Sequence, residues 1–150
     1  MRAADAIQVD SIDAFATGRL QNIRVLVVDD DREARELFAA ILEGAGASVT
    51  AAASANDALD VLRRDAQDVL VSDIEMPDVD GYALVRAALG VARDRGDRLK
   101  TIAVTAYSRA EDEARSHAAG FDRHVRKPIE PRTLVSAVHS VWAAALPHTA

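Results

Sequence analysis

The chain alternates between short apolar runs and longer segments in which apolar residues recur every three or four positions. Short apolar runs bounded by polar residues or glycine are typical of buried strands, and the longer periodic segments are typical of amphipathic helices. The runs predict five strands, over residues 24–28, 48–53, 68–72, 101–105 and 122–125. Because a helical segment follows each strand, the pattern predicts an α/β, doubly wound domain built on a parallel sheet.

Residues suited to a helix start precede most of the predicted helices. A capping side chain accepts a hydrogen bond from a backbone N–H that has no partner within the helix, and proline fits the first turn. The candidate start residues, in chain order, are Asp31, Ser54, Asp80, Ser108 and Pro131. The apolar stripe expected to turn the first helix toward the core comprises Ala34, Leu37, Phe38, Ile41 and Leu42. The helix between Ser108 and Gly120 is rich in alanine and has few large apolar anchors, so we expect its packing to be easily biased.

The length of 150 residues fits one domain that is large enough to bury a core. Hydrophobic residues make up 49% of the chain but aromatic residues only 4%, so we expect a core of valine, leucine, isoleucine and alanine. Residues 1–22 have mixed polarity and are predicted to form a tail or linker, with a short helix around residues 11–17 as the alternative. We therefore place the domain at residues 23–146 and a C-terminal tail at residues 147–150.

Charge and cysteine content narrow the range of partners. A net charge of −6 argues against a nucleic-acid surface, which needs clustered lysine and arginine. The absence of cysteine excludes disulfides and thiolate metal sites. No apolar run approaches the ~20 residues of a membrane span, and the N-terminus lacks the apolar segment of a secretory signal. We expect a soluble, cytoplasmic protein that binds neither nucleic acid nor membrane.

Chemically active side chains follow four of the predicted strands. Asp29 and Asp30 come directly after the first strand, Asp73 after the third, Thr105 ends the fourth and Lys127 follows the fifth. The carboxyl ends of parallel strands share one edge of a sheet, where such folds bind ligands, so we expect these side chains to converge. Each residue alone has an ordinary structural explanation as a helix cap, a strand end or a surface side chain, but the joint pattern favours a site.

The residue types at this edge suit a divalent cation held beside a phosphoryl acceptor. Carboxylates that are forced together repel one another, and Mg²⁺ prefers oxygen ligands of this kind. Asp73 is the candidate nucleophile, because a carboxylate can accept a phosphoryl group as an acyl phosphate. We expect Mg²⁺ to bridge Asp30, Asp73 and a phosphoryl oxygen. Lys127 then supplies a positive charge, and Thr105 a hydroxyl donor.

Together these residues resemble the receiver domain of two-component response regulators, over about residues 24–146. Asp73 is similar to the phospho-acceptor in the family's Asp-x-x-Met-Pro-x-x-Asp-Gly signature. The matching motifs, in the family's order, are Val-Leu-Val-Val-Asp29-Asp30, the stretch from Asp73 to Gly81, Thr105-Ala106 and Lys127-Pro128. The resemblance implies a flavodoxin-like (βα)5 sandwich with the strand order 2-1-3-4-5.

The resemblance also implies a phosphoacceptor function in a phosphorelay. A phosphohistidine on a sensor histidine kinase or a histidine phosphotransfer protein is expected to donate its phosphoryl group to Asp73. The protein is then not a conventional enzyme, because it catalyses transfer to its own side chain and slowly loses the group again. The family pattern further implies that the backbone carbonyl of Glu75 ligates Mg²⁺, that Asp29 acts through a bound water and that Ala106 adjoins the phosphoryl group. It also implies a cis Lys127–Pro128 bond.

Two features depart from the family pattern. His124 stands where the family usually has tyrosine or phenylalanine, three residues before the lysine of the fifth strand, so the aromatic switch is expected to be altered. Glu75 and Tyr107 lie two residues after the acceptor and the switch hydroxyl, at positions that in the family influence how readily water reaches the phosphoryl group. Whether Glu75 disfavours the phosphoryl group or orients water is left open by the sequence.

The expected readout surface combines the helix at 108–120, the strand at 122–125 and the helix that starts at Pro131. Phosphorylation is expected to shift this surface between two pre-existing shapes that a downstream protein distinguishes. About twenty residues follow Lys127, which suggests a stand-alone receiver or the terminal receiver of a hybrid histidine kinase rather than a chain with a C-terminal output domain.

Other classes of protein remain as alternatives. A metal-dependent phosphatase with an aspartyl nucleophile uses a similar sheet, and the run Asp29-Asp30-Asp31 imitates its pair of acids. A protein-interaction module on the same fold needs no phosphorylation, and its binding would survive Asp73→Asn. A calcium loop at residues 78–81 is disfavoured because the ligand spacing and the twelfth-position glutamate are missing.

Overall fold

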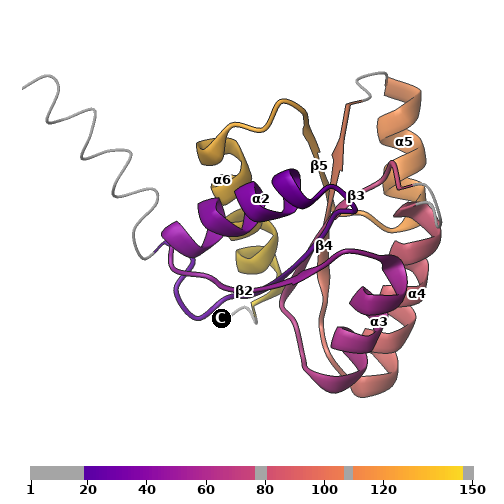
Figure 1. The fold of residues 1–150 in the computed structure, drawn as a ribbon. Coiled ribbons are helices and arrows are strands. Elements are labelled where there is room, and N and C mark those ends of the chain that lie inside the picture. The colour runs from indigo at the N-terminus through magenta and orange to yellow at the C-terminus, as the bar shows by residue number, and fades with distance from the viewer. Residues whose placement is uncertain (1–18, 77–80, 107–109, 147–150) are drawn as a thin grey trace, which may run out of the picture.

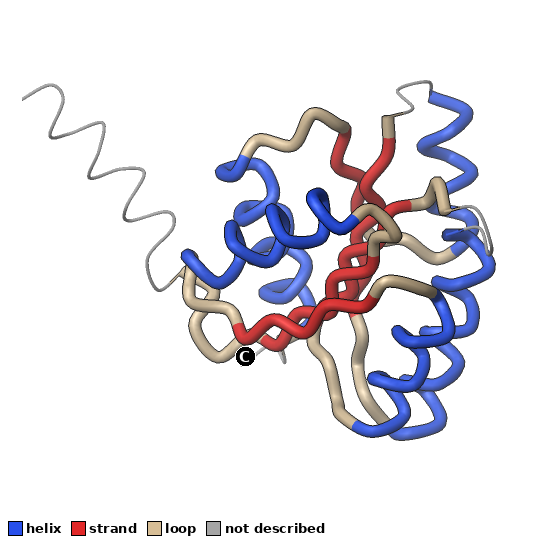
Figure 2. The backbone as a smooth tube through the Cα atoms, in the orientation of Figure 1, coloured by secondary structure: helices blue, strands red, loops and turns tan. Residues whose placement is uncertain are grey.

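The computed structural model describes residues 19–76, 81–106 and 110–146. Its centre is a five-stranded parallel sheet in the order β2-β1-β3-β4-β5, which confirms the predicted architecture (Figures 1 and 2). The strands are β1 (Arg24–Val28), β2 (Ser48–Ala52), β3 (Val69–Asp73), β4 (Lys100–Thr105) and β5 (Arg123–Arg126). The described helices are α2 (Arg32–Gly44), α3 (Ala55–Arg64), α4 (Gly81–Arg95), α5 (Ala110–Ala119) and α6 (Pro131–Ala145).

Helices cover both faces of the sheet. Figure 1 shows α2 and α6 on one face and α3, α4 and α5 on the other. Side chains of α2 and α6 share a core cluster with alternate residues of the central strands, and α3 and α4 build a second cluster on the opposite face. Both clusters consist mainly of valine, leucine, isoleucine and alanine, as the composition predicts. Among the described residues, no helix combines the length and the apolar character needed to traverse a lipid bilayer.

The strand register aligns the carboxyl ends of the strands along one edge. Val28 of β1 lies opposite Ser72 of β3, and Asp73 lies opposite Val104 of β4. Thr105, the last residue of β4, pairs with Arg126 of β5. Each residue that immediately follows one of these strands therefore emerges beside the end of its neighbour, which brings the predicted site residues to one edge.

Local capping explains where several helices begin. The Asp31 side chain accepts a hydrogen bond from the Glu33 N–H at the start of α2, and Ser54 accepts one from Asp57 at the start of α3, as predicted. Pro131 lies in the first turn of α6. The candidate caps Asp80 and Ser108 and the alternative helix at residues 11–17 lie outside the described residues.

The predicted stripe of α2 is wrong at one position. Phe38 and Leu42 are buried, but Leu37 is 52% exposed. Each helical residue advances the side-chain direction by about 100°, so Leu37 points a full step away from Phe38 and lies outside the arc that faces the sheet. On α5, in contrast, only Ser116 and Ala119 are buried, which agrees with the expectation of a helix with few large anchors.

Candidate functional site

Three carboxylates meet at the carboxyl edge of the sheet. Asp29, Asp30 and Asp73 each offer an oxygen within 4.8 Å of the others. Asp29 and Asp73 are buried and Asp30 is exposed, so the cluster has a buried base and a solvent-facing side. Two strands that are distant in sequence supply these acids, because β1 and β3 are neighbours in the sheet.

Asp29 is the most deeply buried acid of the cluster, with no exposed surface. Its Oδ1 accepts a hydrogen bond from the Asp31 N–H at 2.9 Å, whereas its Oδ2 has no hydrogen-bond partner among the described residues. Burial raises the pKa of this carboxyl to about 6, and the nearby charges of Asp73 and Asp30 add to the rise, although the Asp31 N–H and Lys127 oppose it. Binding of a cation or a proton, which neutralises this carboxylate, is therefore favourable.

Asp73 ends β3 with its two oxygens held by different partners. Its Oδ1 accepts a hydrogen bond from the Glu75 N–H at 3.0 Å, and Lys127 Nζ lies 3.4 Å from its Oδ2. Lys127 reaches this position from the loop after β5, where the Lys127–Pro128 peptide bond is cis, as predicted. A carboxylate that has donors on both oxygens and two further carboxylates beside it is positioned to bond to an electrophile brought in by a metal ion.

The donor set fits Mg²⁺. Two buried and one exposed carboxylate supply the oxygen ligands that this ion prefers, and the exposed side leaves room for the waters and phosphate oxygens that usually complete its coordination. The unpartnered Oδ2 of Asp29 and the raised pKa of that group are what a cation would relieve.

A second group of donors lies on the β4 side of Asp73. The backbone N–H of Ala106 donates a hydrogen bond to Oε1 of Glu75 at 3.0 Å, and Thr105 Oγ1 lies 3.5 Å from the same oxygen. Sequence reasoning placed Glu75 beside the site but did not foresee that its carboxylate contacts these donors. Tyr107, the other predicted modulating residue, lies outside the described residues.

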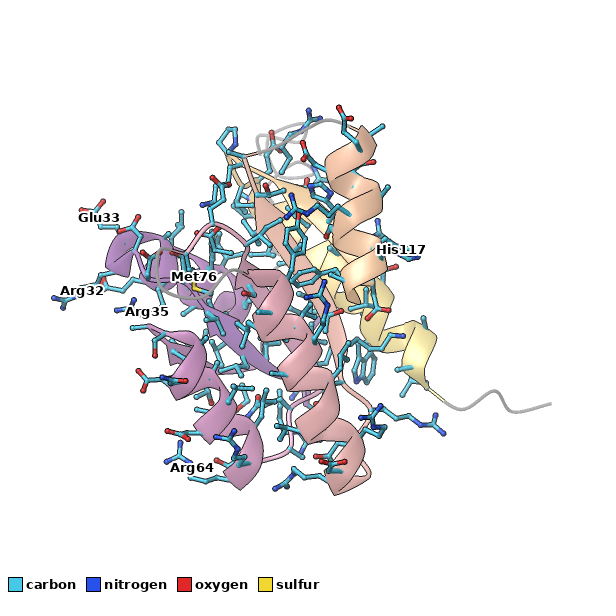
Figure 3. All side chains as sticks on the ribbon, turned by 90° about the vertical axis from the view of Figure 1, so that its right-hand side faces the viewer. Arg32, Glu33, Arg35, Arg64, Met76 and His117 are labelled. Atoms are coloured by element: carbon cyan, nitrogen blue, oxygen red, sulfur yellow. The ribbon has the colours of Figure 1, made fainter. Side chains whose placement is uncertain are left out.

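Gly81, the first residue of α4, packs directly against the backbone of Ile74 and Asp73. A Cβ at this position would lie 2.5 Å from Ile74 Cα and 3.0 Å from the Asp73 carbonyl oxygen, closer than packed atoms allow. Its N–H donates to the Ile74 carbonyl at 3.1 Å. The glycine is thus required by the close approach of α4 to the backbone of Asp73, a role that the sequence signals only through its place in the motif. Figure 3 labels Met76, the last residue described before Gly81, and Arg32, Glu33 and Arg35 on α2.

His124 lies on β5, away from the acids. Its side chain is largely buried, with Nδ1 3.9 Å from Oε1 of Glu113 on α5. Open hollows adjoin it on both sides: one is lined by residues of α5, and the other by residues of α6. The structure therefore places His124 within the predicted readout surface rather than in the acidic site.

Comparison with known proteins agrees with this geometry. The family model described as response regulator receiver domain matches residues 25–139. An uncharacterized 14.6 kDa protein from the sodA1 3′ region of Leptolyngbya boryana is 39% identical, covering 83% of this chain and 94% of that protein. The response regulator protein FleR of Pseudomonas aeruginosa is 36% identical over 77% of this chain. The match covers only 24% of FleR, so the chain spans about a quarter of that relative.

A solved structure gives the same result. The crystal structure of a CheY-like response regulator receiver domain protein from Methanospirillum hungatei JF-1 superposes with a TM-score of 0.73 and 30% identity, covering 81% of this chain and 94% of that one. The residues that the family model matches include all three acids, Thr105 and Lys127. This chain belongs to the response regulator receiver domain family of two-component signalling.

Proposed function

We propose that Asp73 accepts a phosphoryl group from a phosphohistidine on a sensor histidine kinase or a histidine phosphotransfer protein. One observation carries this proposal. The Asp73 carboxylate has an oxygen within 4.8 Å of carboxylate oxygens of Asp29 and Asp30, and its Oδ2 lies 3.4 Å from the Lys127 ammonium. Receiver domains interact with such histidine-containing partners and typically bind Mg²⁺ in an acidic pocket, which supports this role for the cluster described above. The proposal takes residues 23–146 as the receiver, with residues 1–22 as a tail or linker and 147–150 as a C-terminal tail.

The transfer step uses Asp73 as the nucleophile. A carboxylate oxygen of Asp73 forms a bond to phosphorus while the phosphorus–nitrogen bond of the donor breaks. The electron pair of that bond stays on the imidazole nitrogen, which takes up a proton from solvent. Asp73 thereby becomes an acyl phosphate that carries the negative charge of the phosphoryl group. The chain promotes its own modification by positioning and charge, and water later hydrolyses the product slowly.

Several surrounding residues stabilise the negative charge that the phosphoryl group adds. Asp30, Asp73 and the backbone carbonyl of Glu75 would hold Mg²⁺, which would supply positive charge to neutralise the phosphoryl oxygens. Asp29 would contribute through a water bound to that ion. The ammonium of Lys127, beside Asp73 Oδ2, supplies a further positive charge. Thr105 Oγ1 and the Ala106 N–H donate hydrogen bonds to the phosphoryl group once they are released from Glu75.

The output is proposed to pass through the face formed by α5, β5 and α6. Only two residues of α5, Ser116 and Ala119, are buried, and both are small, so we expect that little free energy is needed to shift its packing. His124 replaces the usual aromatic side chain on this face, and the open hollows beside it give a downstream protein a surface to read.

The test is incubation with a small acyl phosphate and Mg²⁺, followed by intact-mass measurement. We expect a gain of one phosphoryl group that requires Mg²⁺ and disappears in Asp73→Asn. Asp60→Asn, which removes an exposed acid on α3, is the matched control and should leave the gain unchanged. Absence of any gain with several donors would refute the proposal and favour a phosphorylation-independent binding module, whereas rapid release of inorganic phosphate would favour a phosphatase.

A further inference from the structure

The Glu75 carboxylate contacts the Ala106 N–H and the Thr105 hydroxyl, the two donors that the proposed function assigns to a phosphoryl group. Its Oε1 accepts the Ala106 N–H at 3.0 Å, a good hydrogen bond, and lies at the limit of contact with Thr105 Oγ1, at 3.5 Å. A backbone N–H carries one hydrogen, so it donates fully to one acceptor at a time. A phosphoryl oxygen on Asp73 and the carboxylate of Glu75 therefore compete for Ala106.

The backbone positions Glu75 for this contact. The Glu75 N–H is fixed on Asp73 Oδ1 at 3.0 Å, and the Ile74 N–H donates to the Val104 carbonyl at 3.2 Å, which extends the β3–β4 pairing past the end of β3. Residue 75 thus leaves β3 directly beside the start of the loop after β4. Its side chain is long enough to bridge the two loops, and its charge makes it a strong acceptor.

We propose that Glu75 is an internal anionic competitor, whose carboxylate holds the Ala106 N–H and approaches the Thr105 hydroxyl until a phosphoryl group on Asp73 displaces it. This proposal rests on the proposed function and identifies a residue that sets how readily the phosphoryl group is accepted. Glu75 opposes the incoming group in two ways, because it occupies a donor and because it adds a like charge beside the acids.

The proposal predicts that a variant without the Glu75 carboxylate accepts a phosphoryl group more readily than the wild type. Glu75→Ala removes both the competing acceptor and its negative charge, and it should strengthen the binding of a phosphoryl analogue. Beryllofluoride, which bonds to a carboxylate as a phosphoryl group does, is the probe, titrated in saturating Mg²⁺ so that any change in Mg²⁺ affinity is excluded. We expect Glu75→Ala to bind about three- to thirtyfold more tightly than the wild type, since a charge-assisted hydrogen bond and a repulsion are both removed but the side chain is exposed. Glu75→Gln keeps the acceptor without the charge and should lie between the two.

Controls separate this proposal from the proposed function. Glu33→Gln, an exposed change of equal charge on the first turn of α2, should leave the affinity unchanged. Asp73→Asn should abolish binding; if the wild type itself fails to bind, or Asp73→Asn still binds, the proposed function fails. If binding depends on Asp73 but Glu75→Ala binds no more tightly than the wild type, the competitor proposal alone is overturned.

A second readout needs neither Mg²⁺ nor a phosphoryl analogue. The Ala106 amide proton should resonate downfield in the wild type because it bonds to a charged oxygen, and it should move upfield in Glu75→Ala. Glu75→Gln should give an intermediate position, and Glu33→Gln no change. An Ala106 resonance that is identical in wild type and Glu75→Ala would overturn the contact on which the proposal rests.

Discussion

The two sides of Asp73 differ in how their charges are satisfied. The metal half, made of Asp29, Asp30 and Asp73, gathers three carboxylates, one of which has an oxygen with no hydrogen-bond partner among the described residues. The anion half, made of Thr105 and the Ala106 N–H, holds donors that already contact a carboxylate, that of Glu75. We therefore propose that a negative side chain acts as a metal ligand on one side of the site and as a competitor of the phosphoryl group on the other. Removing an acid should weaken ligand binding on the metal half and strengthen it on the anion half.

The largest expected effect concerns the metal half. Asp30→Asn removes an exposed carboxylate of the cluster and should lower the affinity for Mg²⁺ by about a hundredfold, or ~2.7 kcal/mol, because a charged oxygen ligand is lost. Calorimetric titration with Mg²⁺ measures this directly. Glu75→Gln, which removes the same charge from the neighbouring loop but keeps the backbone carbonyl, should cost far less. An equal loss of Mg²⁺ affinity in the two variants would contradict the proposed difference between the metal half and the anion half.

A pH-dependent stability should follow from Asp29. Its pKa in the folded protein is raised to about 6 from 3.8, so the folded state binds this proton more tightly than the unfolded chain does. In the absence of Mg²⁺, the free energy of unfolding should therefore fall as the pH rises from about 4 to 7, by about 2 kcal/mol after allowance for solvent screening. Asp29→Asn carries no such charge and should be more stable than the wild type by about this amount at pH 7, with little difference below pH 4.

Denaturant titrations of both proteins across this pH range provide the check. Added Mg²⁺ should stabilise the wild type more than Asp29→Asn, since a ligand that binds only the folded state shifts the equilibrium toward it. A wild type that is as stable as the variant at pH 7 without Mg²⁺ would show that Asp29 carries no uncompensated charge.

A smaller effect is expected at Gly81, the first residue of α4. Gly81→Ala places a methyl group 2.5 Å from Ile74 Cα, so backbone must move, and we expect a loss of about 1.5 kcal/mol of stability. Gly90→Ala is the matched control on the same helix, because a Cβ there meets nothing within 4 Å. It should raise stability by about 0.5–1 kcal/mol through helix propensity. Thermal unfolding of the two variants should thus shift in opposite directions, and a parallel shift would contradict the close packing at Gly81.

Much of this architecture was predictable because it depends on local pattern. The apolar runs placed each strand within one residue of its observed ends, and parallel pairing then required Asp29, Asp30 and Asp73 to meet. The exposure of Leu37 was missed, since periodicity alone does not fix how wide an arc of a helix the sheet covers. The contact of Glu75 with Ala106 was missed for a related reason: it joins side chain to backbone across two loops, and only the register of β3 with β4 brings them together.

The most direct test of the account is to locate the phosphoryl group after incubation with acyl phosphate and Mg²⁺. Borohydride reduces an aspartyl phosphate to homoserine, and peptide mass spectrometry then identifies the residue that was modified. We predict one modified residue, Asp73, in the wild type and none in Asp73→Asn. Modification of Asp29, Asp30 or Glu75 in place of Asp73, or of no residue at all, would contradict the assignment of Asp73 as the acceptor.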